Sequence, residues 1–280
     1  MSKIKIVTDS TVDLSPEVLS KYDITAVPLS LMVDGETYLD RVDITPSEFI
    51  EKMKQSKELP KSSQPAVGVF VELYDRFHQE GYEVLSIHMT GGMSGTVQSA
   101  EMAAGMSEAS VTVIDSKFIS KALSFQVIEA ARMAKEGKSM SEIVARLNQV
   151  RQQTRLFVVV DTLENLVKGG RIGKGRALIG SILKIKPIAS LEGGVYNPVA
   201  KVRSHAQVVT FLANQFAEDV KGKTIKAVGI AHAEGLELAM KVKAAIKEMT
   251  GFDQTEIDET TPIISTHTGL GAIGFMYYFE

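Results

Sequence analysis

The sequence contains no cysteine. It therefore has neither a disulfide framework nor a thiolate metal site, and catalysis by a cysteine nucleophile is excluded. The five histidines lack the HExxH spacing and form no close group, so we expect no metal site. A chain without cysteine fits a reducing compartment, and we expect a cytoplasmic protein.

Long apolar runs are also missing. No run approaches the roughly 18 residues that a membrane-spanning helix needs, and the N-terminus, MSKIKIVTDS, begins with a strand pattern rather than the apolar region of a signal peptide. We expect a soluble protein that makes at most transient contact with a membrane. The net charge of -3 at pH 7 gives no reason to expect a nucleic-acid partner.

Residues 83–96, whose glycines fit neither the GxxxxGKS/T nor the GxGxxG spacing of common nucleotide-binding loops, form the most informative stretch of the chain. They read EVLSIHMTGGMSGT. This pattern predicts a short buried strand, a loop containing Gly91, Gly92 and Gly95, and a helix that begins at Thr96. The order is that of a strand, a glycine loop and a helix start.

Such a loop favours a bound anion, because the first N–H groups of a helix lack intrahelical partners and lie at the positive end of the helix dipole. Ser94 adds a hydroxyl group at this point. The alternative is that the glycines only make a tight turn and that Ser94 caps the helix. The stretch misses the GxSxG nucleophile elbow at its last residue, Thr96.

Strands alternate with helices along the first half of the chain, which predicts an α/β protein with a mostly parallel sheet covered on both faces. The apolar run at 156–160 opens a second α/β domain. We place the domains at residues 1–153 and 154–280, although no proline-rich or serine-rich linker marks the boundary.

Several local patterns give specific expectations. Asp34-Gly35 predicts a two-residue hairpin, residues 175–183 resemble a helix, and residues 265–271 resemble a loop rich in hydroxyl groups and glycine. His267 lies in that loop, so it is a better functional candidate than the other histidines. The alternative is a histidine that hydrogen-bonds within its own loop.

Two further segments carry candidate residues. Leu59–Pro65 places Ser62 in a loop that its two prolines keep stiff, although Ser62 could instead cap the following helix. Asp161–Ala177 interleaves glycines with basic residues, among them Arg171, and could meet a phosphate or an acidic partner. As an alternative, it is an ordinary solvated turn.

Six ordered motifs resemble those of one family, the DegV family of bacterial fatty-acid-binding proteins. The resemblance runs from the first strand to the C-terminal end, and the motifs are IVTDSTVDL, KSSQPAVG, SGTVQSA, VIDSK, KGGRIG and HTGLGA. It implies a two-domain DegV-like α/β fold, in which the N-terminal sheet is mostly parallel and the C-terminal sheet is mixed. It also implies that the chain binds one long-chain fatty acid, such as palmitate, with the carboxylate at a polar site and the acyl chain buried.

The resemblance further implies a role in lipid metabolism as the partner of a separate, ATP-dependent fatty acid kinase, which phosphorylates the bound carboxylate. The binding protein would then be no enzyme and need no cofactor. By position in the motifs, Ser62 and Ser94 correspond to the carboxylate donors and His267 to a histidine in the same network. Arg171 and Arg203 correspond to basic positions of the head-group network or of the kinase-docking surface.

A second hypothesis is a serine hydrolase or acyl-transferase that uses Ser94 as nucleophile and His267 as base. Such an enzyme needs an acid that orients the imidazole, and only Asp9 or Asp115 is available as a weak candidate. Neutral hydroxyls and helix N–H groups suit the binding hypothesis, because they hold a carboxylate without a buried salt bridge and leave it exchangeable.

Overall fold

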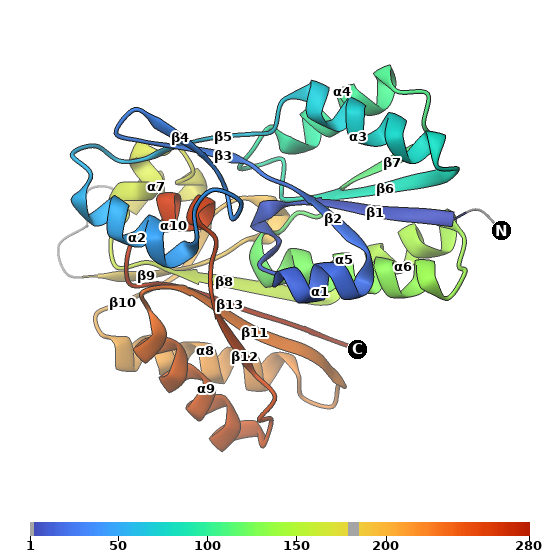
Figure 1. The fold of residues 1–280 in the computed structure, drawn as a ribbon. Coiled ribbons are helices and arrows are strands. Elements are labelled where there is room, and N and C mark those ends of the chain that lie inside the picture. Colours follow the sequence, from blue (N-terminus) through green and yellow to red (C-terminus); the bar gives the residue numbers. More distant parts are fainter. Residues whose placement is uncertain (1–2, 179–184) are drawn as a thin grey trace.

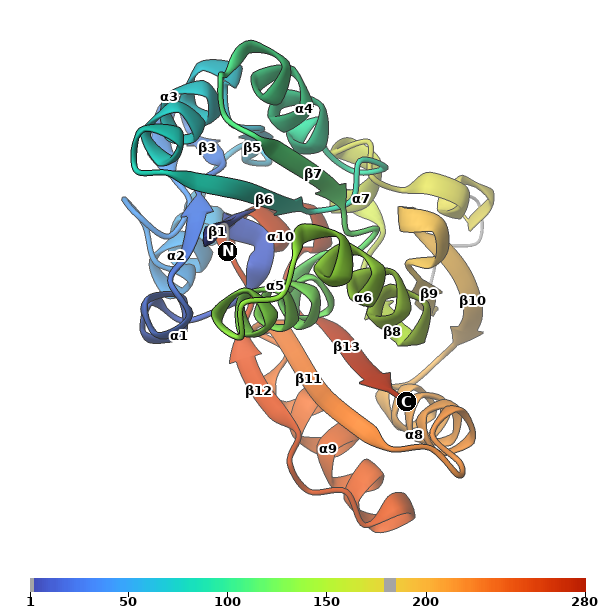
Figure 2. The same cartoon turned by 90° about the vertical axis from the view of Figure 1, so that its right-hand side faces the viewer.

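The structure, a computed structural model, describes residues 3–178 and 185–280. These residues form five layers: helices, a sheet, helices, a second sheet and helices (Figure 1). The middle helical layer is shared, because α5 (Ser120–Lys135) contacts strands of both sheets. Figure 2 shows α5 and α6 (Met140–Gln153) lying between the sheets from a second direction.

The N-terminal sheet is parallel throughout, as predicted. Its strands, in spatial order, are β2 (Ile24–Val27), β1 (Lys3–Asp9), β6 (Tyr82–His88) and β7 (Val111–Asp115). Helices α3 (Val67–Gln79) and α4 (Thr96–Met106) cover one face, and α1 (Pro16–Tyr22), α5 and α6 lie on the other. A 3-10 turn, η1 (Ser10–Val12), follows β1. The expected cover on both faces is therefore confirmed.

The second sheet is mixed, which also confirms the expectation. In spatial order its strands are β10 (Asn197–Val202), β9 (Lys186–Ser190), β8 (Thr154–Val159), β13 (Ala272–Phe279), β11 (Ile225–Ala233) and β12 (Glu256–Glu259). Only the β11–β12 pair among them is parallel in the described residues. Helices α8 (His205–Asp219) and α9 (Leu236–Thr250) lie along the outer face (Figure 1).

A small third sheet contains the predicted hairpin. Strands β3 (Ser30–Val33) and β4 (Glu36–Leu39) are joined by Asp34-Gly35, and both turn residues have positive φ, as such a turn requires. The sequence interpretation was wrong about the loop before Pro65, because Lys61–Ser63 forms strand β5 along β3. The prolines exclude a helix there but not a strand, and β3 supplies the backbone partners. Helix α2 (Pro46–Gln55) follows β4.

The expected loop at residues 265–271 is also wrong in part, because α10 (Pro262–Thr268) is a helix. Thr261 caps it with its side chain, proline occupies its first turn, and Gly269 ends it with a φ of 76°. The hydroxyl and glycine content of the segment concealed these helix signals. His267 therefore lies in the last turn of a helix and not in a loop.

The basic glycine-rich segment is mostly made of short turns. Helix α7 (Glu164–Lys168) is followed by the 3-10 turn η2 (Gly173–Leu178), and η3 (Glu192–Gly194) joins β9 to β10. The helix expected at 175–183 lies outside the described residues from 179 onward, and its first residues belong to η2.

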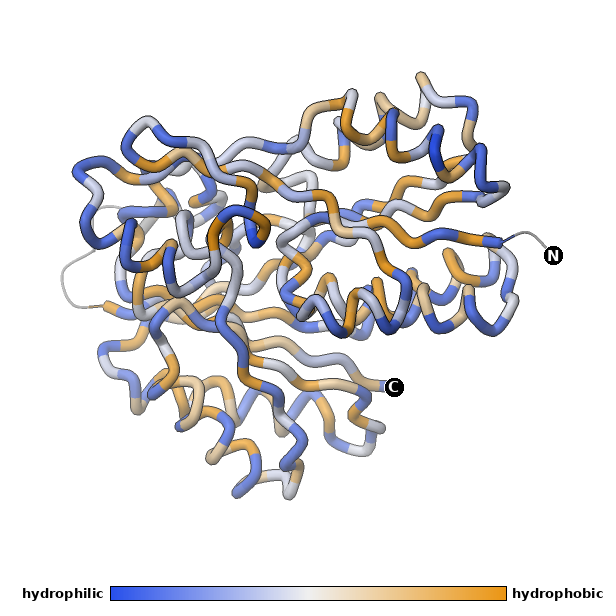
Figure 3. Tube along the Cα trace, viewed as in Figure 1, coloured by the Kyte–Doolittle hydropathy of each residue, from blue (hydrophilic) through white to orange (hydrophobic). Residues whose placement is uncertain are grey.

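One cluster of buried apolar side chains connects the two sheets. It includes Leu85 of β6, Leu123 of α5, and Val158 and Met276 of the second sheet. Figure 3 shows the apolar residues concentrated along the strands and on the inward sides of the helices. Helix α6 ends at Gln153 and β8 begins at the next residue, and the division into domains at this point stays a prediction. Among the helices that the structure describes, none is both long and apolar enough to cross a bilayer.

Candidate ligand-binding site

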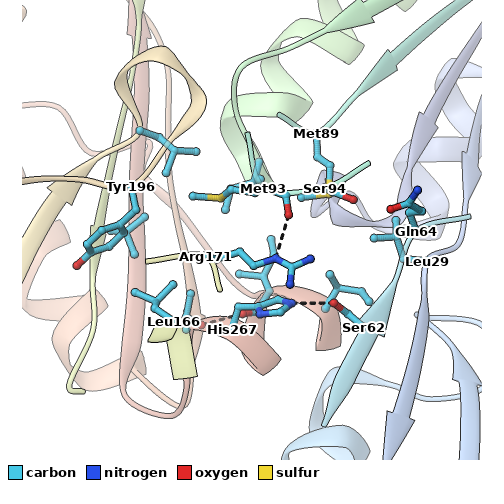
Figure 4. Close-up of a pocket in the computed structure, with 16 residues that line it drawn as sticks. Leu29, Ser62, Gln64, Met89, Met93, Ser94, Leu166, Arg171, Tyr196 and His267 are labelled. Carbon is cyan, nitrogen blue, oxygen red and sulfur yellow. Dashed lines mark hydrogen bonds between the residues drawn. The ribbon is translucent and has the colours of Figure 1, made fainter. Parts of the chain in front are cut away.

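A narrow cavity of about 50 Å³ lies where the two halves of the chain meet (Figure 4). Ser62, Arg171 and His267 lie close together and form its polar end, and most of the other lining side chains are apolar. The lining residues are Leu29, Ser62, Gln64, Met89, Met93, Ser94, Ile119, Val158, Leu166, Arg171, Leu191, Tyr196, Ile263, Ile264, His267 and Thr268. The structure thus brings four of the five predicted site residues, Ser62, Ser94, Arg171 and His267, to one cavity.

Ser62 and His267 form the central polar contact. The hydroxyl oxygen of Ser62 lies 2.7 Å from Nε2 of His267, which joins β5 to the last turn of α10. Ser62 does not cap α3, whose N-cap is Ala66 without a side-chain hydrogen bond. The capping alternative for Ser62 is therefore wrong, and its hydroxyl faces the cavity (Figure 4).

His267 is a neutral imidazole at physiological pH. Burial, together with the smaller effect of the positive charge of Arg171, lowers its pKa to about 4. Among the described residues its Nδ1 has no hydrogen-bond partner. The ring lies close to the backbone at Gly169, where a Cβ atom would come within 2.4 Å of Nδ1. Only a glycine leaves room for the imidazole at this point.

Arg171 carries the only permanent charge among the described residues that line the cavity. Its Nε donates to the carbonyl of Met93 at 3.0 Å, and its Nη1 donates to the carbonyl of Gly169 at 2.5 Å. Burial lowers the pKa of this guanidinium, yet it stays protonated because an arginine pKa lies far above neutral. The cavity lining thus contains a charged donor beside the neutral hydroxyls.

Ser94 lies at the start of α4 and serves the local backbone as well. Its hydroxyl lies 2.8 Å from the Thr96 hydroxyl and accepts a hydrogen bond from the Thr96 amide at 3.3 Å. The loop before it is anchored to the C-terminal half, since the Thr90 hydroxyl donates to the Gly194 carbonyl at 2.9 Å. The N-cap of α4 is Gly95, so Ser94 is not the cap that the alternative supposed, although its hydroxyl bonds the first turn and lines the cavity.

The hydrogen bonds do not assemble the hydrolase alternative. His267 pairs with Ser62 and not with Ser94. Asp115 bonds Lys117, so this acid candidate is engaged away from the imidazole of His267. A nucleophile and base in mutual contact are what the hydrolase mechanism needs, and these two side chains have other partners.

A serine–histidine–aspartate chain does occur elsewhere, in the interior. His88 lies 2.7 Å from the Ser86 hydroxyl and 3.1 Å from the carboxylate of Asp9, the second acid candidate. All three side chains are fully buried, and Asp9 also accepts from the Met89 amide at 2.8 Å. This network fixes the end of β6 beside β1 and is closed to any substrate.

Arg203 does not line the cavity. It is exposed just after β10, and its amide donates to the side chain of Gln207 at 2.8 Å. Its assignment to a docking surface stays a prediction.

Sequence reasoning missed the apolar part of the lining and three of its polar members, Gln64, Tyr196 and Thr268. Gln64 lies within the KSSQP motif and packs against Gly95, so the motif itself was a usable signal. Tyr196 is buried in the wall and follows no motif. Burial raises the pKa of its hydroxyl, which has no hydrogen-bond partner among the described residues.

A second, smaller cavity of about 20 Å³ continues the first. The two share four lining residues: Ile119, Val158, Ile264 and Thr268. Beyond these the second cavity is walled mainly by the inner faces of β11 and β13. Together they form a path that leads from the polar end to the space between the second sheet and α5.

The chain matches a known protein family over nearly its whole length. Residues 3–280 match the family model described as "Uncharacterised protein, DegV family". A DegV domain-containing protein of Listeria monocytogenes is 46% identical over 281 residues, and the match covers all of both chains.

Solved structures show the same fold. DegV of Bacillus subtilis, described as a fatty acid binding protein, matches with a TM-score of 0.90, 31% identity and complete coverage of both chains. A stearic-acid-binding protein of Eubacterium ventriosum matches with a TM-score of 0.85 and 28% identity over 99% of this chain and 98% of its own. On the whole-chain match to the family model and the identity to its members, the chain belongs to the DegV family.

Proposed function

We propose that this protein binds a long-chain fatty acid and presents its carboxylate to a separate, ATP-dependent fatty acid kinase. The observation that carries the proposal is the division of the cavity into a polar end, with Ser62, Arg171 and His267, and a largely apolar remainder. A carboxylate on a long hydrocarbon chain has the same division. The Bacillus and Eubacterium structures, which are described as those of fatty-acid-binding proteins, support it.

The polar end offers suitable partners for a carboxylate. If Nε2 of neutral His267 donates to the Ser62 oxygen, the Ser62 hydroxyl is free to donate to the ligand. Ser94 supplies a second hydroxyl, and Arg171 supplies a positive charge (Figure 4). Hydrogen bonds to an ionised group are stronger than those between neutral groups, so the charged head group is favoured over a neutral ester.

The apolar part supplies most of the affinity. Burial of each methylene contributes about 0.8 kcal/mol, so a long chain gains more from its tail than from its head group, even after ordering costs. Met89 and Met93 line this part, and their flexible thioether side chains adapt to a chain that enters between them.

The position of the polar end suits presentation. Ser62, Ser94 and Arg171 are each only half-buried, whereas the apolar wall residues Ile119 and Val158 are buried. A bound carboxylate would therefore lie near the surface, where its oxygen can attack the γ-phosphorus of ATP held by the kinase and release ADP. The binding protein would position the substrate and take no part in bond making.

Native mass spectrometry of the purified protein tests the proposal, followed by extraction and identification of any bound small molecule. We expect one long-chain fatty acid per protein, retained until the protein unfolds. A protein that is empty and also takes up no added fatty acid would overturn the proposal. Exposure to an activated ester is the companion test, because covalent acylation of Ser94 would support the hydrolase alternative instead.

A further inference from the structure

The second cavity borders Gly274 of strand β13, which leaves open the space that a side chain would fill. Along β13, Ala272, Gly274 and Met276 point to the inner face, since alternate residues of a strand share a face, and Ala272 and Met276 belong to the inner core cluster. Gly274 is the middle member of this row and lines the second cavity. A larger side chain at this position would occupy the space that the cavity now has.

The neighbours of Gly274 leave the space open. Gly274 pairs with Ala231 on β11 and with Val158 on β8, and the nearest atoms that an added Cβ would meet are the methyl group of Met276 at 3.3 Å and the Ala231 carbonyl at 3.9 Å. The glycine is not demanded by its backbone, because its φ is not positive. Glycine within a strand commonly marks a place where a ligand approaches the backbone.

The far wall of this cavity is fixed. Ser120 at the start of α5 and Thr260 just before α10 both line it, and both hydroxyls donate to the buried carboxylate of Asp13, from Thr260 at 2.9 Å. The Thr261 amide donates to the same carboxylate at 3.0 Å. A wall whose hydroxyls are all held by one buried acid cannot easily recede before a longer ligand.

We propose that this second cavity is a distal chamber for the end of the acyl chain, and that Gly274 sets the longest chain that the protein holds well. The inference rests on the proposed function. Ile119, Val158, Ile264 and Thr268, which line both cavities, form the neck through which a chain passes into the chamber. Short chains end before the neck, and longer chains place their last methylenes against Gly274 and Met276.

The test compares affinities for saturated fatty acids from lauric to arachidic acid. For the wild type we expect affinity to rise about fourfold per added methylene while the chain still fills the chamber, and to level off once it reaches the far wall. Gly274→Val should keep the affinity for the shortest members and lose at least about tenfold for the longest, so that the curve levels off at a shorter chain. Gly274→Ala should give a curve between those of the wild type and Gly274→Val. This variant replaces Gly274→Val in the test if the valine variant folds poorly.

The matched control is Ala227→Val, which adds bulk on neighbouring β11 but outside the lining of either cavity. It should leave the whole curve unchanged. If the wild type binds fatty acids and the Gly274 variants show the same dependence on chain length, the distal chamber is overturned and the proposed function stands. If the wild type binds none of the series, the proposed function fails and the chamber fails with it.

Discussion

The hydroxyl of Ser62 and Nε2 of His267 lie 2.7 Å apart, although 205 positions separate them in the sequence. One belongs to a short strand of the N-terminal half and the other to a helix near the C-terminus. The contact at the head-group end of the cavity therefore exists only when both halves are folded together. A ligand that engages Ser62 also acts on α10 through His267.

Loss of the two serine hydroxyls should weaken fatty-acid retention and leave the fold intact. A hydrogen bond to a charged group contributes about 1.5–3 kcal/mol, so the double variant Ser62→Ala, Ser94→Ala should bind at least about tenfold more weakly. Competition with a fluorescent fatty acid measures this. Ser63→Ala is the control, because the Ser63 side chain is exposed and its loss should not change fatty-acid retention. Equal retention by the double variant would remove both serines from the site.

A side chain at position 169 should displace the imidazole of His267. The Cβ atom of Gly169→Ala would lie 2.4 Å from Nδ1 of His267 and 3.0 Å from the Asn165 carbonyl, so we expect a loss of roughly 1–3 kcal/mol in stability together with weaker lipid binding. Thermal unfolding and the same competition assay test this. The control is Gly68→Ala, because nothing lies within 4 Å of the added Cβ atom. It should neither lower the stability nor weaken lipid binding. An unaltered His267 ring signal in NMR spectra of the Gly169 variant would contradict the prediction.

Arg171 should matter to the kinase reaction more than to lipid capture. Its guanidinium holds the Met93 loop to Gly169 beside the head group, so Arg171→Ala should misplace the carboxylate while the tail still binds. We expect the rate of phosphorylation in a coupled kinase assay to fall at least about tenfold. A tenfold decrease corresponds to a loss of about 1.4 kcal/mol of transition-state stabilisation. The exposed Arg176, changed to alanine, is the control from the same segment. Normal turnover of the kinase with the Arg171→Ala variant would show that Arg171 does not position the carboxylate.

A substitution at Arg203 should affect docking to the kinase without affecting fatty-acid binding. It is exposed and outside the cavity, so Arg203→Ala should leave fatty-acid affinity unchanged and raise the concentration of binding protein at which the kinase is half-saturated. A titration of the kinase with wild type and variant measures that concentration. Identical titration curves would show that Arg203 takes no part in docking.

Asp40 should make the stability depend on pH. Burial raises the pKa of Asp40 from 3.8 to about 7, with the Ser10 hydroxyl opposing the shift and the Asp13 carboxylate adding to it. Between these values the native state holds a proton that the unfolded state has lost, so the free energy of unfolding falls as pH rises from about 4 to about 7. The Asp40→Asn variant has no carboxyl group at this position, so its free energy of unfolding should not show this decrease.

The stability of Asp40→Asn relative to the wild type should therefore increase over that range by roughly 2–4 kcal/mol and stay level above it. Denaturant unfolding of both proteins at about pH 5 and about pH 8 measures the difference. His267 titrates in the opposite direction, because its pKa is lowered to about 4, but it is present in both proteins and cancels. A difference that does not vary with pH would show that Asp40 is ionised throughout.

Local chemistry made much of the fold predictable. The Asp34-Gly35 turn and the glycine loop before Thr96 both form as the sequence indicates. Their signals act over a few residues, so a single sequence reveals them. The parallel N-terminal sheet followed from the same alternation of strands and helices.

What escaped prediction depends on distant partners. Lys61–Ser63 is a strand only because β3 lies beside it. The apolar wall, with Leu166 as an example, has no spacing that distinguishes it from ordinary core. Such contacts are set by the packing of the two halves, which a local pattern does not contain.

The shared position of α5 between the two sheets constrains how this protein can change through evolution. A substitution on its face toward β1 alters the packing of the N-terminal sheet, and one on its face toward β13 alters the wall of the cavity, yet both faces belong to one helix. The two halves therefore cannot diverge independently. Lineages that acquire a different lipid preference through β11 or β13 should carry compensating changes on the facing side of α5, and exchange of one half between distant relatives should fail unless α5 is exchanged with its partners.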